Sequence, residues 1–264
     1  MNLNEINFSF GGLHCLRDFG CIYAEKTGHA ITPAIQRNEY EIAGVPGSLD
    51  MPGALPGEIT FSGTLYFLSE PTSQAEAQQR LRAIGAWLTD GRKPLIFDYE
   101  PDVYYMASMD ESAAWSFSSW IGGGLDIKFT AQPYAHAVTE TQASASTSDT
   151  SLALVLTLDT GQRTPLCVDI EATGTAPITG ATVTADGKQA AFADMSIAQG
   201  DALQINMEPP IGAVFSSGEN ALPYATRFDA LEAVSGAQTI RVTLTYGSGT
   251  RGASITARAR GRWL

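Results

Sequence analysis

Apolar and polar residues alternate along much of the first half of the chain. In residues 59–67, isoleucine, phenylalanine and leucine fall at odd positions, with threonines between them. Alternation with a period of two is typical of a strand that buries one face. The alternating runs 115–117 and 125–129 flank Gly122-Gly123-Gly124 and predict a β-hairpin. Residues 1–138 are therefore predicted to be mainly β.

One stretch in this half has helical periodicity instead. Ser73 followed by Glu76 forms a capping box, and apolar residues then recur at three- and four-residue spacing. We therefore expect a single helix, from Ser73 to about Leu88. Three prolines and four glycines between Gly44 and Gly57 predict a projecting loop or hairpin tip.

A Ser/Thr-rich segment, residues 139–151, interrupts the alternating pattern. Eight of its thirteen residues are Ser or Thr, and none is a large apolar residue. Such a run buries too little surface to offset the entropy of ordering the chain. It is predicted to be a linker or an exposed edge, and it divides the chain into domains 1–138 and 152–264.

The second domain shows only strand periodicity. Its alternating runs are residues 152–158, 166–170, 203–205, 240–246 and 255–263. Several strands with no helix between them predict an antiparallel β-sandwich.

Composition and charge narrow the function classes. The chain has 264 residues, of which 17% are charged, and its formal net charge is −12. An acidic chain does not neutralise a phosphate backbone, so nucleic acid is excluded as an expected partner. The longest aliphatic stretch, residues 152–156, is far shorter than a membrane span, and the first residues lack a secretory pattern. We therefore expect no membrane partner either.

The cysteines and histidines form no recognised catalytic or metal motif. Cys15, Cys21 and Cys167 form neither an even set nor a metal signature, and are predicted to be reduced and mostly buried. The histidines, His14, His29 and His136, lie in no catalytic motif. We therefore predict no catalytic residue, no metal site and no cofactor.

The most enzyme-like segment is acidic, with Asp98, Glu100 and Asp102 at alternate positions. Three such carboxylates suit a calcium ion, or general acid–base work on a glycoside. The alternative is a solvated acidic turn between two strands, which Pro101 favours because proline breaks a strand. Four nearby aromatic residues suit either a sugar-stacking platform or core packing: Tyr104, Tyr105, Trp115 and Trp120.

Arg258, Arg260 and Arg262 form a stripe on one face of the last predicted strand. The stripe is a candidate docking surface for an acidic partner. The alternative is solvent exposure, in which the arginines discourage pairing between sheet edges.

Several segments, read in order, resemble the distal tail protein family of long-tailed phages and prophages of Gram-positive hosts. In the first domain the resemblance is carried by Phe8-Ser-Phe10-Gly-Gly12, Asp18-Phe19-Gly20, Arg37 with Val45-Pro46-Gly47, Trp87-Leu88, Pro94–Tyr99, Tyr104–Ala107 and Phe129–Tyr134. In the second domain it is carried by Asp159–Gly161, Thr164-Pro165, Phe228–Leu231, Gly236–Ile240 and Arg260–Leu264. Ala237-Gln238 departs from the acidic residue and asparagine that the family often has in that turn.

The resemblance implies a structural, non-enzymatic protein of the virion tail tip, assembled in the cytoplasm of the bacterial host. Domain 1–138 is then a β-sandwich or barrel-like domain, with one helix and a projecting hairpin, that closes a hexameric ring. Domain 152–264 is then a galectin-like antiparallel β-sandwich. The implied partners are further copies of the chain, the major tail tube protein, the tail-associated lysin or tip protein, and the receptor-binding protein.

Two other function classes remain open. The strand-only second domain suits a carbohydrate-binding adhesin module that recognises host cell-wall polysaccharide, although a sandwich fold alone does not establish sugar binding. The third hypothesis is a wall-degrading glycosidase that uses Asp98 and Glu100.

Overall fold

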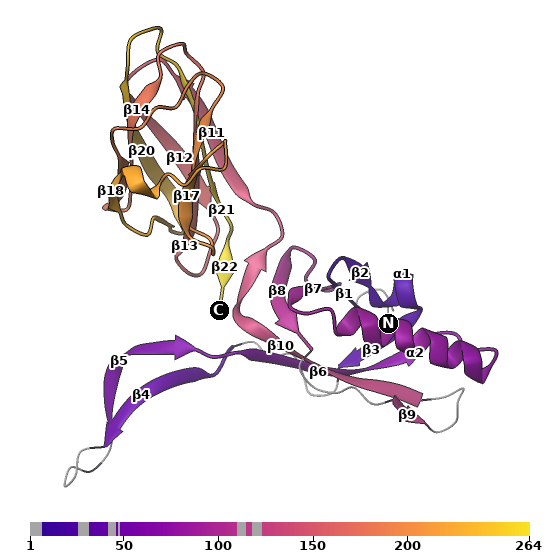
Figure 1. Cartoon of the computed structure of the whole chain (residues 1–264). Helices are drawn as coiled ribbons and strands as arrows, with labels where there is room; N and C mark the ends of the chain where they lie inside the picture. Colours follow the sequence, from indigo (N-terminus) through magenta and orange to yellow (C-terminus); the bar gives the residue numbers. More distant parts are fainter. Residues whose placement is uncertain (1–6, 26–31, 42–45, 47, 110–114, 118–122) are drawn as a thin grey trace. The chain divides into compact units, whose positions relative to one another are not determined.

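The computed structural model describes residues 7–25, 32–41, 46, 48–109, 115–117 and 123–264. His29, Trp120, the Gly122 end of the glycine turn, and Val45 and Gly47 lie outside the described residues. The chain divides into two compact units. Unit 1 is Met1–Val138 with Leu264, and unit 2 is Thr139–Trp263 (Figure 1).

A curved antiparallel sheet forms most of unit 1. Its strands are β1 (Phe8–Phe10), β2 (Leu13–His14), β3 (Cys21–Glu25), β6 (Ile59–Phe67), β7 (Lys93–Phe97), β8 (Val103–Ser108), β9 (Trp115–Phe117) and β10 (Gly123–Ala137). They lie in the order β2-β1-β7-β8-β10-β6-β3, and β9 pairs with β10. The predicted hairpin is confirmed, with Leu125 opposite Trp115.

The core of unit 1 is aromatic and lies on one face of this sheet. Phe61 and Leu65 are fully buried, as the alternation along β6 predicts. The Phe8 ring packs edge-on against Phe129, with ring centroids 5.3 Å apart, and stacks on Trp87 of the helix that covers this face. Strand periodicity in the sequence therefore identifies the buried face correctly.

The long helix, α2 (Gln74–Leu88), lies where the sequence predicts it. The Ser73 Oγ accepts the backbone N–H of Glu76 at 3.2 Å, which caps the first turn. The prediction of a single helix is wrong, because Cys15–Phe19 forms a short helix, α1. The His14 side chain caps this helix. Histidine is not one of the residues by which a helix N-terminus is recognised in a sequence. No helix within the described residues is long and apolar enough to cross a membrane.

A separate hairpin occupies the glycine- and proline-rich region of unit 1. Among the described strands, β4 (Ile35–Glu41) and β5 (Ser48–Pro56) pair only with each other. Figure 1 shows them as a two-stranded arm that continues into β6. At its base the Gly57 N–H donates to the Ala34 carbonyl at 2.6 Å. A Cβ at position 57 would lie 2.9 Å from that oxygen, so the close approach favours glycine.

Unit 2 is an antiparallel β-sandwich, as the strand-only pattern predicts. One sheet has the order β11-β21-β13-β16-β17, with β19 paired to β13, and the other has the order β12-β20-β14-β15-β18. The first sheet contains β11 (Thr141–Thr147), β13 (Thr164–Ala172), β16 (Ala202–Asn206), β17 (Gly212–Phe215), β19 (Glu232–Ala233) and β21 (Ala253–Ala259). The second contains β12 (Ser151–Leu158), β14 (Ile178–Ala185), β15 (Lys188–Phe192), β18 (Ala225–Phe228) and β20 (Gly236–Tyr246). A short 3₁₀ helix, η2 (Leu222–Tyr224), precedes β18, and β22 (Arg262–Trp263) ends the unit.

A single apolar core joins the inner faces of the two sheets. It contains alternate residues of both, such as Leu156 and Val242 from one sheet and Val168 and Ile255 from the other. Alternate burial along each strand is the pattern that a sandwich requires.

The prediction of a linker over residues 139–151 is wrong. Residues 141–147 form β11 and pair in register with Ala253–Ala259 of β21. Ala143 and Ala145 pack against the core of unit 2, while the Ser144 and Thr256 hydroxyls are hydrogen bonded at 2.8 Å. Because β11 lies at the edge of its sheet, small side chains are sufficient there. The segment is therefore an exposed edge, the other structure that its composition predicts.

Candidate functional site

The acidic segment forms the turn between β7 and β8. The Asp98 carboxylate contacts the His14 imidazole, with Nε2 at 3.1 and 3.0 Å from its two oxygens. Glu100 forms a side-chain hydrogen bond with Tyr105, and burial together with this acid raises the pKa of Tyr105 to about 12. The two acids proposed for glycoside chemistry therefore each have a protein partner. No cluster of three or more metal-ligating side chains occurs among the described residues.

Both nitrogens of the His14 ring are hydrogen bonded. Nδ1 accepts the backbone N–H groups of Leu16 and Arg17 at 3.1 and 3.2 Å. Because Nδ1 accepts, the ring proton lies on Nε2 and is donated to Asp98. The ring therefore has a structural role at the start of α1. Among the other histidines, His136 stacks on Tyr104 with ring centroids 5.3 Å apart.

The three cysteines are buried and free of disulfides, as predicted. Burial raises the pKa of Cys15 to about 11 and that of Cys21 to about 12. Burial also raises the pKa of Cys167. Because the thiolate is the nucleophile, these three residues are poor catalytic candidates.

The aromatic residues near the acidic turn contribute to packing. Tyr105 is buried, and its ring packs against Phe61 at 4.9 Å. The Trp115 ring packs against Phe67 at 4.6 Å. For Tyr105 and Trp115 the structure therefore supports core packing rather than a sugar-stacking platform.

Arg258 of the arginine stripe is bonded within unit 2. The Arg258 Nη2 lies 3.2 Å from Oδ2 of Asp169 on the adjacent strand β13, and its Nη1 lies 3.9 Å from Oε2 of Glu140. Burial raises the pKa of Asp169, although Arg258 lowers it. The two predicted alternatives for the stripe, a docking surface and solvent exposure, did not include an ion pair within unit 2. Arg260 and Arg262 are half-buried, and for them the docking role stays a prediction.

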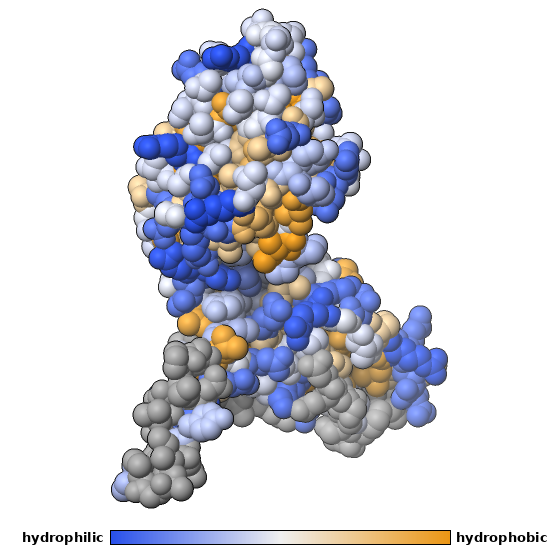
Figure 2. Space-filling view, turned by 60° about the vertical axis from the view of Figure 1, so that its left-hand side comes forward, coloured by the Kyte–Doolittle hydropathy of each residue, from blue (hydrophilic) through white to orange (hydrophobic). Residues whose placement is uncertain are grey.

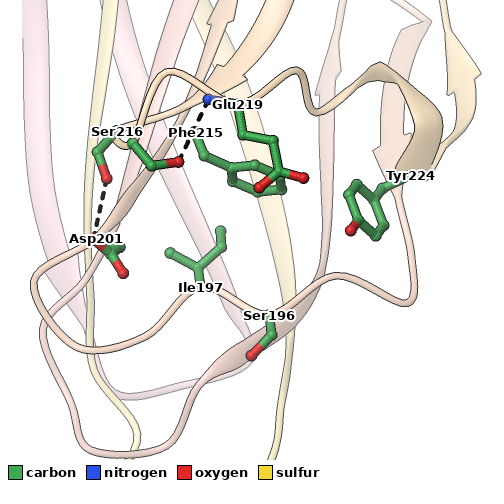
Figure 3. Close-up of a pocket in the computed structure, with 8 residues that line it drawn as sticks. Ser196, Ile197, Asp201, Phe215, Ser216, Glu219 and Tyr224 are labelled. Carbon is green, nitrogen blue, oxygen red and sulfur yellow. Dashed lines mark hydrogen bonds between the residues drawn. The ribbon is translucent and has the colours of Figure 1, made fainter.

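A pocket that the sequence did not indicate lies at one end of the sandwich (Figure 3). It has a volume of about 280 Å³ and is lined by Ser196, Ile197, Asp201, Phe215, Ser216, Ser217, Glu219 and Tyr224. These residues come from the segment before β16, the end of β17, the turn after it, and η2. Because they belong to separate turns with no common spacing, no motif marks them in the sequence.

Hydrogen bonds order the polar side of this pocket. The Ser216 hydroxyl donates to Asp201 Oδ1 at 3.3 Å (Figure 3). The Glu219 N–H donates to Ser217 Oγ at 3.4 Å. On the apolar side, the Phe215 and Tyr224 rings meet edge to face, with centroids 5.7 Å apart. The pocket therefore combines acidic, hydroxyl and aromatic groups.

A second cavity, of about 330 Å³, lies beside α1 and α2 in unit 1. Among the described residues that line it, Arg80 is the basic one, and it pairs with Glu76 at 2.6 Å and donates to the Ser69 carbonyl at 3.1 Å. The guanidinium also lies over the Phe67 ring. These contacts hold the positive group within unit 1.

The chain has the fold of a solved phage protein. No protein-family model matches the sequence, and no curated protein does. The crystal structure of SPP1 Dit (gp 19.1) is similar, with a TM-score of 0.71 and 14% identity. The likeness covers 98% of this chain and 99% of SPP1 Dit, which is described as a paradigm of the hub adsorption apparatus in phages infecting Gram-positive bacteria. It confirms the predicted mainly-β fold class.

A second similarity is far weaker. BuGH86 in complex with neoagarooctaose has a TM-score of 0.23 and 6% identity, and the match covers 89% of this chain but 34% of BuGH86.

Proposed function

We propose that the chain is a structural protein of a phage tail and a member of the distal tail protein family. The observation that carries this proposal is the likeness to SPP1 Dit over 98% of one chain and 99% of the other. Such coverage means that both units are matched, whereas a shared sandwich alone would match unit 2 only. The ordered motifs in the sequence support the same family.

The proposed assembly is a hexameric ring at the tip of the tail tube. In this ring unit 1 contacts neighbouring copies, and the ring joins the major tail tube protein to the tail-associated lysin and the receptor-binding protein. The β4–β5 hairpin supports this role because it carries exposed apolar side chains: Ile35, Tyr40 and Leu55 are 62%, 68% and 66% exposed. Large exposed apolar groups on one element are typical of a surface that a partner covers.

The candidate catalytic groups support a structural role. Asp98 and Glu100 bond to His14 and Tyr105, and the imidazole of His14 uses both of its nitrogens within unit 1. A glycosidase needs one carboxyl group that is free to donate a proton and a second that is free to attack or to activate water. The turn that carries Asp98 and Glu100 does not offer that arrangement.

Electron microscopy of the full chain tests the proposal. We expect six-fold rings with a central channel, either at high protein concentration or on mixing with the tube protein from the same phage. A chain that stays monomeric in the presence of the tube protein would contradict the ring. A monomer at low concentration alone would not, because assembly by mass action depends on concentration and on the partner.

A further inference from the structure

Among its described lining residues, the pocket at the end of the sandwich has two carboxylates and no basic group. Its acidic residues are Asp201 and Glu219, and no lysine or arginine is among its lining residues. The Asp201 carboxylate accepts a hydrogen bond from the Ser216 hydroxyl. Figure 3 shows the Glu219 side chain extending alongside the Phe215 ring, with its carboxylate toward the middle of the pocket. The negative potential of this pocket favours a cationic ligand.

Two aromatic rings adjoin the carboxylates. Phe215 and Tyr224 are half-buried, so each keeps part of its ring surface open to the pocket. The face of an aromatic ring attracts a cation, and it also packs against the apolar face of a saturated ring. Buried Ile197 adds apolar surface at the same place. The aromatic side of the pocket therefore suits a ligand that has both a positive group and an apolar face.

Three serine hydroxyl groups complete the lining. Ser196, Ser216 and Ser217 are exposed and belong to two different turns. A hydroxyl both donates and accepts hydrogen bonds, so these side chains can pair with hydroxyl groups of a ligand. Small-molecule sites usually have volumes of about 300–1,000 Å³. At about 280 Å³, this pocket accommodates one sugar ring rather than a long oligomer.

We propose that this pocket binds a single amino-sugar residue with a free ammonium group. The ammonium group pairs with Glu219 and Asp201, the ring packs on Tyr224 and Phe215, and the ring hydroxyls bond to the serines. A neutral sugar leaves both carboxylates without a cation, and a lysine side chain brings no hydroxyl group to the serines. An amino sugar satisfies all three kinds of group.

This inference goes beyond the proposed tail function and does not depend on ring formation. The pocket is built from unit 2 residues alone, so binding is measurable on the full chain whether it is monomeric or assembled. Failure to bind sugar leaves the ring proposal standing, and failure to form rings leaves the pocket intact.

Titration of the full chain with glucosamine and with glucose tests the proposal. At about pH 6 the amine of glucosamine is protonated, so the two probes differ in charge. Calorimetry, or NMR shifts of residues 196–224, gives the two affinities. We expect glucosamine to bind at least about tenfold more tightly than glucose, because a hydrogen bond to a charged group is stronger than one between neutral groups.

Two matched variants locate the binding site. Glu219→Gln keeps the size of the side chain and removes its charge, and we expect it to weaken glucosamine binding about tenfold. Glu208→Gln makes the same change beyond the opposite end of β16 and should leave binding unchanged. The NMR spectrum of each variant reports whether the fold is retained.

Three outcomes would overturn the proposal. The first is equal affinity for glucose and glucosamine, which removes the role of the carboxylates. The second is no binding of glucosamine at concentrations up to about 100 mM. The third is an equal loss of affinity in both variants, which places the effect outside the pocket.

Discussion

The Nε2 atom of His14 lies 3.1 and 3.0 Å from the two carboxylate oxygens of Asp98, a residue 84 positions further along the chain. The same imidazole caps α1 through its Nδ1 atom. Asp98 begins the turn between β7 and β8, so this pair connects the first helix to the acidic turn. One of the two acids considered for glycoside chemistry therefore orients the cap of a helix.

Replacing Asp98 by Asn should lower the free energy of unfolding by about 1–2 kcal/mol, because the hydrogen bond from His14 then lacks a charged acceptor. Chemical denaturation of the full chain measures the change. Asp102→Asn, an exposed position in the same turn, is the matched control. A loss of equal size in both variants would mean that general charge, rather than the His14 contact, decides stability.

Glu76 gives a prediction for acid pH. Hydrogen bonds from Thr72, and then from Arg80, lower the pKa of Glu76 from 4.5 to about 2. A pKa that is lower in the folded state stabilises the fold above the unfolded value, and this contribution is lost as the pH falls from about 4.5 toward 2. The stability difference between the native chain and Glu76→Gln should therefore shrink across that range.

NMR titration of Glu76 in a Thr72→Val variant checks the cause. Removing the Thr72 hydroxyl should raise the pKa of Glu76 toward 4.5, because this hydrogen bond is the largest contribution to the shift. Glu70→Gln, an exposed acid just before α2, serves as the control for net charge. An unchanged pKa in Thr72→Val would contradict the assignment.

Local chemistry explains why some elements could be predicted and others could not. Ser73 and the alternation along β6 act over a few residues, so the sequence alone locates α2 and the buried face of the sheet. The cap of α1 needs a histidine ring that Asp98 orients from a distant turn, and no local pattern contains that partner. The register of β11 likewise depends on Ala253–Ala259, more than a hundred residues away.

For the same reason, the ion pair of Arg258 in the arginine stripe could not be predicted from the sequence. The predicted strand that carries all three arginines is divided in the structure: Arg258 lies in β21, Arg260 follows that strand and Arg262 lies in β22. The acid that pairs with Arg258 lies on another strand. Asp169 lies opposite Thr256 and next to Arg258 only because β13 and β21 pair in that register. The sandwich pocket is harder still, because turns that are distant in sequence bring Asp201 and Tyr224 together.

Replacing Arg258 by Gln should lower the free energy of unfolding by about 1 kcal/mol, since Asp169 then remains half-buried without its cation. Removing the nearby positive charge should also raise the pKa of Asp169 further. Adding Asp169→Asn to the Arg258→Gln variant should recover part of the loss, which a double-mutant cycle by chemical denaturation measures. Strictly additive losses would show that the two residues do not interact.

Docking of a partner during assembly is the role expected for Arg260 and Arg262. If they meet an acidic partner surface, replacing both by Gln should weaken ring formation, and the effect should be larger at low salt because salt screens exposed charges. Sedimentation of the chain mixed with the tube protein, at low and high ionic strength, measures this. Arg251→Gln, an exposed position before β21, is the control. If the native chain, the double variant and Arg251→Gln assemble equally strongly, the stripe does not dock a partner, and solvent exposure is the correct alternative.

The β4–β5 hairpin gives the sharpest test of the ring. Replacing Ile35, Tyr40 and Leu55 by Ser removes three apolar side chains that are each more than 60% exposed, so the fold of a single copy should be unaffected. If neighbouring copies cover this surface, the variant should stay monomeric at concentrations where the native chain forms rings. Val155→Ser changes a comparably exposed apolar residue in unit 2 and should assemble normally. Rings of native stability in the hairpin variant would show that this surface is not the contact between copies.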